Sequence, residues 1–173
     1  MNRLTRLFLM ILAMAAMLPA GPAAAHEFTV GSLVIIHPTA RPNLPNRPMA
    51  AYVTIANDGD APDRLVAVSA PGFTAAELHE SKMQGTTMTM QRVTAVELPA
   101  HDAVVLEPGG LHIMLFGAAR QFKPGESFPM ILQFEAAGEV RVDVVVEKPA
   151  PGQAGGMAPG HGHAGHGAGQ SGN

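Results

Sequence analysis

Short stretches in which apolar and polar residues alternate fill the middle of the chain. Between His26 and Pro149 turn signals separate these stretches, and apolar residues do not recur at helical spacing over any long segment. We expect strands at residues 28–36, 51–56, 64–69, 76–80, 86–93, 103–106, 111–115, 128–135 and 139–147. In the last of these, valines alternate with mainly polar residues, which predicts one side facing a core and one facing water.

Glycine and proline mark the breaks between the expected strands. The breaks contain Asn57-Asp58-Gly59-Asp60, Pro71-Gly72, Pro108-Gly109-Gly110 and Pro124-Gly125. Glycine permits a positive φ there, and proline presets φ near about −65°. Many short strands with this punctuation indicate an antiparallel sandwich or barrel, so we predict an all-β fold with a single domain.

The first 25 residues have the composition of a secretory signal peptide. Arg3 and Arg6 precede an uncharged apolar run at residues 7–18, and Ala23-Ala24-Ala25 supplies the small residues of a cleavage site. We expect cleavage after Ala25, export of the protein and a folded domain at residues 26–149. The alternative is a membrane anchor, but about 12 apolar residues fall short of the roughly 20 that a spanning helix needs.

Residues 150–173 differ in kind from the rest of the chain. They are rich in glycine and carry no charge, so they cannot bury enough apolar surface to offset the entropy of ordering, and we expect a disordered tail. His161, His163 and His166 place three imidazoles within six residues, a composition typical of binding to Cu(II), Zn(II) or Ni(II). The alternative is a terminus without a role.

Charge and composition exclude several classes of function. The chain has 11 Lys and Arg against 14 Asp and Glu, and removal of the two arginines in the signal peptide leaves 9 against 14, which argues against nucleic acid as a partner. Cysteine is absent, which excludes disulfides, thiol catalysis, iron–sulfur clusters and thiolate sites for zinc or copper. Methionine (11) and histidine (8) are plentiful.

Histidine and methionine gather first between residues 79 and 90. His79 and Met90 bound this segment, and Met83 and Met88 lie inside it. On a strand Met88 and Met90 share one face, whereas we expect Met83 to lie in a loop. Met83 and Met88 are candidates for shielding a metal, for binding it transiently, or for ordinary packing in the core.

A second group occupies residues 111–115. Leu111, Ile113 and Leu115 form an obvious core face, so His112 and Met114 are expected to point away from that core. The alternative is that both faces of this strand are buried, as happens near the edge of a two-sheet fold.

Thioether sulfur and imidazole nitrogen are neutral ligands, and soft sulfur favours Cu(I) over the harder ions. Methionine and neutral histidine bind Cu(I) and can still release it, so we expect a surface site that suits a carrier. Because histidine must be deprotonated to bind, affinity should fall as the pH drops through the imidazole pKa.

The spacing of these residues, H-x10-M-x21-H-x-M, resembles that of the PCuAC-type periplasmic copper chaperones. The resemblance covers about residues 27–147 and includes the turn and strand from Pro108 to Leu115. It implies a cupredoxin-like Greek-key β-sandwich or barrel in the periplasm, with Cu(I) held by His79, Met90, His112 and Met114. It also implies delivery of copper to the binuclear copper centre of cytochrome c oxidase, directly or alongside a Sco-type thiol protein. We expect a monomer that does not span the membrane after cleavage.

Two features qualify the resemblance. Members often carry Pro-Trp where this chain has Pro38-Thr39, so the first strand is expected to pack differently, although no ligand is lost. Some members share a Met- and His-rich tail linked to extra Cu(II) capacity. The matching residues here are Met157, His161, His163 and His166.

Two other functions remain open. Cleavage after Ala25 would leave His26 as the first residue, and an N-terminal histidine can chelate Cu(II) in a copper oxidoreductase, although the Met-rich segment favours Cu(I). A buffer that sequesters copper without delivering it fits the same ligands. No nucleophile–base set and no phosphate-binding loop is visible, so we expect a protein that is not an enzyme.

Overall fold

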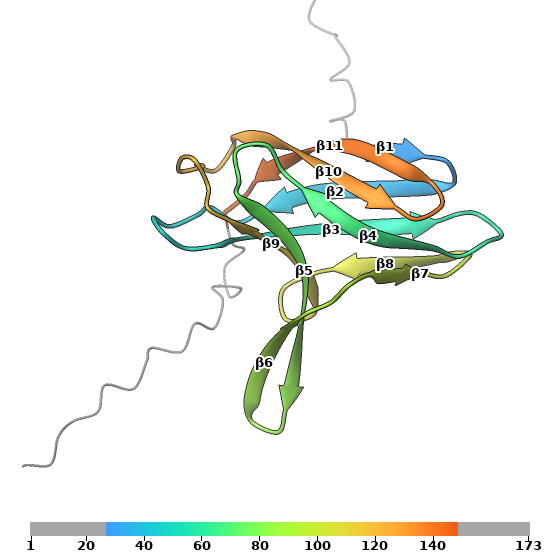
Figure 1. The fold of residues 1–173 in the computed structure, drawn as a ribbon, viewed down its shortest axis with the longest axis horizontal. Helices are drawn as coiled ribbons and strands as arrows, with labels where there is room; N and C mark the ends of the chain where they lie inside the picture. Colours follow the sequence, from blue (N-terminus) through green and yellow to red (C-terminus); the bar gives the residue numbers. More distant parts are fainter. Residues whose placement is uncertain (1–26, 149–173) are drawn as a thin grey trace, which may run out of the picture.

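The computed structural model describes residues 27–148, which form eleven strands and no helix (Figure 1). The strands are β1 (Glu27–Val30), β2 (Leu33–Ala40), β3 (Met49–Asn57), β4 (Asp63–Ser69), β5 (Ala75–Gln84), β6 (Thr87–Arg92), β7 (Val96–Leu98), β8 (Asp102–Leu106), β9 (Leu111–Phe116), β10 (Ser127–Phe134) and β11 (Gly138–Val146). The prediction of an all-β fold is confirmed. The expected signal peptide and tail lie outside the described residues. Among residues 27–148 no helix is long and apolar enough to span a membrane.

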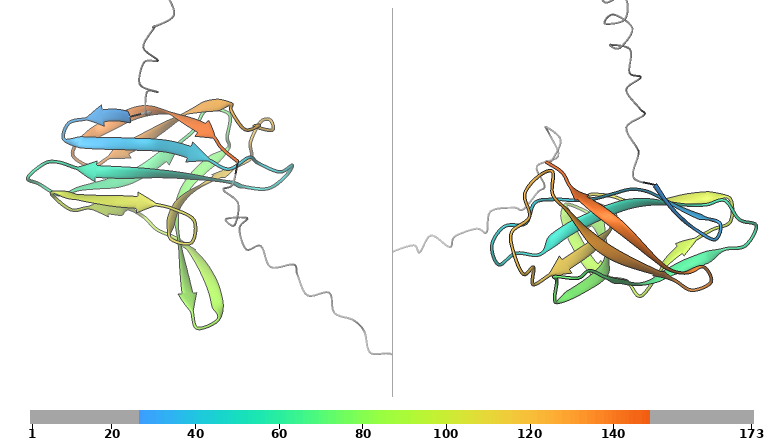
Figure 2. Two further views of the ribbon diagram at one scale, coloured as in Figure 1. Left: turned by 180° about the vertical axis from the view of Figure 1, so that it is seen from behind. Right: turned by 90° about the horizontal axis from the view of Figure 1, so that it is seen from above.

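One curled sheet contains all of these strands. Its order is β6-β5-β9-β3-β2-β11-β10-β4-β7, with β1 added beside β2 and β8 beside β3. Every pairing is antiparallel except the short parallel one between β11 and β2. The chain crosses from β3 to β4 and back from β4 to β5, so neighbours in sequence are often not neighbours in the sheet. The curl brings β10 and β4 across a common core from β3 and β9 (Figures 1 and 2).

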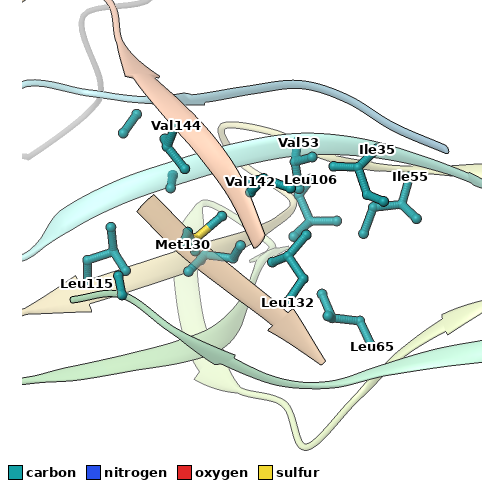
Figure 3. Packing of buried hydrophobic residues seen from close by; sticks show 14 of the residues in the cluster. Ile35, Val53, Ile55, Leu65, Leu106, Leu115, Met130, Leu132, Val142 and Val144 are labelled. Atoms are coloured by element: carbon teal, nitrogen blue, oxygen red, sulfur yellow. The ribbon is translucent and has the colours of Figure 1, made fainter. Parts of the chain in front are cut away.

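The core lies between the facing inner surfaces of the curled sheet. Alternate residues of β3 are buried along its whole length, as are Val142, Val144 and Val146 of β11, so the alternation expected for the last strand is confirmed. Met130 of β10 pairs directly with Val142 of β11, and Figure 3 shows Met130 and Leu132 in the same buried cluster as Val53 and Ile55 of β3. Burial of this apolar surface is the main favourable term for the fold.

Three details differ from the expected strands. The stretch at residues 28–36 is a β1–β2 hairpin that turns at Gly31 and Ser32, since the antiparallel register pairs Val30 with Leu33. β7 was not predicted, because three residues are too few to show an alternation of apolar and polar positions. Met83 does not lie in a loop: β5 continues to Gln84, because its outer half pairs with β6.

The outer halves of β5 and β6 project from the body of the domain as a hairpin (Figures 1 and 2). Gln84 pairs with Thr87, so Gly85 and Thr86 form a two-residue turn. Gly85 has a φ of 63°, while Thr86 is not among the residues with positive φ, which fits a type II′ turn.

A buried carboxylate ties β4 to the turn between β10 and β11. Asp63 accepts hydrogen bonds from the backbone N–H groups of Arg64 (2.7 Å), Ala136 (2.9 Å) and Ala137 (2.9 Å). Burial alone would raise the pKa of Asp63, but the backbone donors outweigh it and hold the pKa below its usual value.

Because this pKa is lowered in the folded state, Asp63 contributes stability that is present above about pH 4 and lost as the pH falls through the folded pKa. Asp63→Asn should lower the free energy of unfolding at pH 7 by about 1–3 kcal/mol, since an amide cannot accept all three bonds. It should also weaken the dependence of stability on pH below pH 4. Urea denaturation at pH 7 and pH 3 measures both effects. Asp143→Asn, at an exposed position of β11, is the control, and equal behaviour of the two variants would contradict the assignment.

Candidate metal centre

β5 lies between β9 and β6 and brings together the four residues singled out in the sequence. Its register with β9 pairs His79 with His112 and Glu77 with Met114. Its register with β6 pairs Ser81 with Met90. Directly opposed residues of an antiparallel pair share a face, as do residues two apart on one strand. His79, Met90, His112 and Met114 therefore lie on one face of these three strands.

The ring of His112 is held in one orientation by the backbone. Its Nδ1 lies 2.9 Å from the carbonyl oxygen of Gly110, and a carbonyl can only accept, so Nδ1 carries the proton. The same carbonyl accepts the N–H of Ser81 at 3.0 Å, which joins β5 to the start of β9. The lone pair of the neutral His112 ring is therefore on Nε2.

The ring of His79 is oriented by a carboxylate on its own strand. Its Nε2 lies 2.9 Å from Oε2 of Glu77, two residues earlier on the same face. The hydrogen bond from His79 is the main reason that the pKa of Glu77 lies below its ordinary value. The Nδ1 atom of His79 is buried and has no hydrogen-bond partner. Buried polar atoms are almost always paired, so a lone pair left in this position fits a ligand atom.

The two imidazoles face each other, with ring centroids 6.0 Å apart and planes tilted by 42°. Each ring is fixed at one nitrogen by an oxygen acceptor, which leaves the other nitrogen available. This is the arrangement that metal-binding histidines require, because the partner of one nitrogen sets the tautomer that exposes the other. The donor set of this face thus fits a metal ion.

The thioethers differ in exposure. Met114 is partly buried beside Glu77, whereas Met90 on the projecting hairpin is 54% exposed. The centre therefore has a buried side at His112 and an open side at Met90, with His79 and Met114 of intermediate burial.

The expectation that His112 points away from the core is wrong in part. Ile113 and Leu115 are buried as predicted, but His112 is itself only 4% exposed. β9 is an inner strand between β5 and β3, so the ring of His79 and the Gly110 turn cover its second face. The site is a half-buried one at the base of the hairpin rather than a surface site.

Sequence reasoning missed the two groups that orient the rings. Glu77 could have been found, since a carboxylate two residues from a histidine on a strand shares its face. The carbonyl of Gly110 could not have been found from the sequence, because every residue has a backbone carbonyl.

His26, Met157, His161, His163 and His166 lie outside residues 27–148. In that range no three His, Cys, Asp or Glu side chains form a group able to hold a metal ion. Met90 and Met114, on the same face as the two histidines, are the candidate sulfur ligands.

Comparison with known proteins identifies related chains. A family model described as putative lipoprotein LpqE-like matches residues 33–146. The putative lipoprotein Lxx21020 of Leifsonia xyli subsp. xyli is 28% identical over 99 residues, which are 57% of this chain and 60% of that protein. The chain therefore spans less than two thirds of that relative's length.

Several solved structures resemble the fold. The apo PCuAC domain from PmoF1 is 34% identical and covers 72% of this chain and 100% of its own, with a TM-score of 0.62. The copper-bound PCuAC domain from PmoF2 has the same identity and TM-score, with coverage of 72% and 99%. CuI-DR1885 from Deinococcus radiodurans is 29% identical over 74% of this chain and 85% of its own, with a TM-score of 0.53. These similarities confirm the predicted cupredoxin-like fold.

The two ring orientations are testable without a metal. When both imidazole rings are neutral, ¹⁵N chemical shifts should show His112 protonated at Nδ1 and His79 protonated at Nε2, because each hydrogen bond fixes the donor nitrogen. Glu77→Leu should leave His79 as a mixture of tautomers while His112 stays unchanged. Glu80→Leu, on the opposite face of the same strand, is the matched control. Protonation of His112 at Nε2 would contradict the geometry.

Proposed function

Because the chain belongs to the LpqE-like family and resembles a copper-bound PCuAC domain, we propose that it is a copper chaperone that acts after export. The observation that carries this proposal is the pair of imidazoles on one face, each with one nitrogen fixed and the other free. The proposed ligands are His79, Met90, His112 and Met114. The chain then binds and transfers its cargo without catalysing a reaction.

The donor set favours Cu(I) as the cargo. The two thioether sulfurs are soft, neutral ligands that favour Cu(I), whereas the hard ions gain more from carboxylates and water. Glu77 is held by the His79 ring and acts through it, as an orienting partner rather than a ligand.

The difference in burial between the ligands suits transfer. The two imidazoles, fixed by Glu77 and Gly110, hold the ion in a defined place and lose little entropy on binding. The exposed sulfur of Met90 can leave, so an acceptor's ligand can take its position before the histidines release the ion. Retention and release are thus assigned to different sides of the same centre.

The proposed acceptor carries thiolates. Thiolate binds Cu(I) more tightly than thioether, and this chain has no cysteine. Transfer of Cu(I) to a cysteine-bearing site is therefore thermodynamically favourable. The copper-bearing subunit of cytochrome c oxidase and a Sco-type protein, both implied by the sequence resemblance, meet this requirement. The proposed location is the periplasm, in agreement with the lipoprotein descriptions of the relatives and the apolar N-terminal segment.

The His-rich C-terminal segment is proposed to bind Cu(II) separately. Met157, His161, His163 and His166 supply a different donor set, in which imidazole predominates and suits the divalent ion. Deletion of residues 150–173 should lower the Cu(II) stoichiometry by at least one equivalent, measured by titration with EPR detection. Cu(I) binding at the main centre should be unchanged. An unchanged Cu(II) stoichiometry would contradict this role.

The main centre is tested by removing its sulfur without changing side-chain volume. Met90→Leu/Met114→Leu should weaken Cu(I) binding by more than the roughly 10–100-fold typical of losing an outer partner of a metal site. Anaerobic competition with a chromophoric Cu(I) chelator measures the affinity. Met130→Leu is the matched control, since this methionine is buried in the core. If the double variant and the control bind Cu(I) with equal affinity, the Cu(I) site must lie in another part of the chain.

A further inference from the structure

Exposed methionines concentrate on the projecting hairpin formed by β5 and β6. Among the described residues five large hydrophobic side chains are strongly exposed, and three of them are Met83 (61%), Met88 (55%) and Met90 (54%). Proposed coordination by the main centre accounts for Met90 alone. Met83 and Met88 lie beside the turn at the outer end of the hairpin, where no core can bury them (Figure 1).

The pairing register places these sulfurs on the face that carries the main centre. Met83 pairs directly with Met88, and Ser81 pairs with Met90. Met83, Ser81 and His79 are spaced two residues apart on β5, so all share one face. The pairs Met83–Met88, Ser81–Met90 and His79–His112 therefore form successive rungs, each about 7 Å from the next along the strand.

The opposite face of the hairpin has a different chemistry. It carries Glu80, Lys82, Gln84, Thr87, Thr89 and Gln91, all of them polar. Lys82 Nζ lies 2.8 Å from Glu80 Oε2, so the charges on that face are paired with each other. Sulfur is therefore restricted to the face that continues from the two histidines.

Two thioethers on directly opposed residues can bind the same ion. The Cβ atoms of such a pair lie about 4.5–5.5 Å apart, and methionine has three rotatable bonds with which to converge its sulfur. Thioether sulfur selects Cu(I), and two such ligands without imidazole bind it more weakly than the main centre does.

We propose that Met83 and Met88 form a second, weaker Cu(I) site, through which the ion enters and leaves the main centre. This inference rests on the proposed function. Met90 lies between the Met83–Met88 pair and the main centre. Its sulfur binds Cu(I) held by that pair and then Cu(I) held by the histidines, or the reverse. Each step replaces one ligand of Cu(I) by another, so the metal keeps its oxidation state and no bond outside the coordination sphere breaks.

The test follows each methionine separately. The protein purified after export, labelled with ¹³C in the methionine methyl groups, is titrated anaerobically with two equivalents of Cu(I). The methyl signals of Met90 and Met114 should shift with the first equivalent, and those of Met83 and Met88 with the second. In Met83→Leu/Met88→Leu the first equivalent should bind as before, and release of Cu(I) to a small chelator should slow by about tenfold.

Leucine keeps the apolar surface and volume of methionine, so the double variant removes only sulfur. Met130→Leu in the core is the control for loss of a methionine. If Met90 and Met114 respond but Met83 and Met88 do not, or if release is unchanged in the variant, the second site is overturned while the main centre stands. If none of these four signals responds, the proposed function fails as well.

Discussion

The candidate centre depends on the antiparallel register between β5 and β9. This register pairs His79 with His112 and Glu77 with Met114, and a slip by one residue would turn one strand's ligands to the other face. Backbone hydrogen bonds extend the pairing past both ends, from Thr74 to Phe116 (2.9 Å) and from Ser81 to Gly110 (3.0 Å). At the first of these ends Gly117 has a φ of 59°, and a Cβ there would collide with the Thr74 side chain. Glycine at this position therefore lets the two strands approach.

The register also explains why the centre is rigid on one side and open on the other. The inner position of β9 buries His112, and the turn that precedes β9 supplies the carbonyl that fixes its ring. Met90 comes from β6, an edge strand all of whose residues are exposed. The same three strands thus provide two imidazoles held in place by hydrogen bonds and one exposed thioether, all of them candidate ligands.

β5 connects these two environments because it is long enough to serve both. Its inner half packs in the domain, where Leu78 is buried, and its outer half forms the hairpin with β6. The two-residue turn at Gly85 keeps the hairpin in register, so the alternation that puts His79 on one face continues unchanged to Met83. A hairpin of this kind lets ligand chemistry extend beyond the body of the domain without a change of face.

The sequence by itself determined the class of fold and the candidate ligands. Alternation and turn residues are local properties, so the strands around Val142, the turn at Pro124-Gly125 and the H-x10-M-x21-H-x-M spacing could be read directly. Only the tertiary structure decided that residues 79 and 112 are neighbours, that His112 is buried, that Met83 belongs to a strand, and that Glu77 and the Gly110 carbonyl orient the two rings. The physical reason is that pairing between distant strands depends on how the whole sheet buries its apolar face, and no short segment encodes that alone.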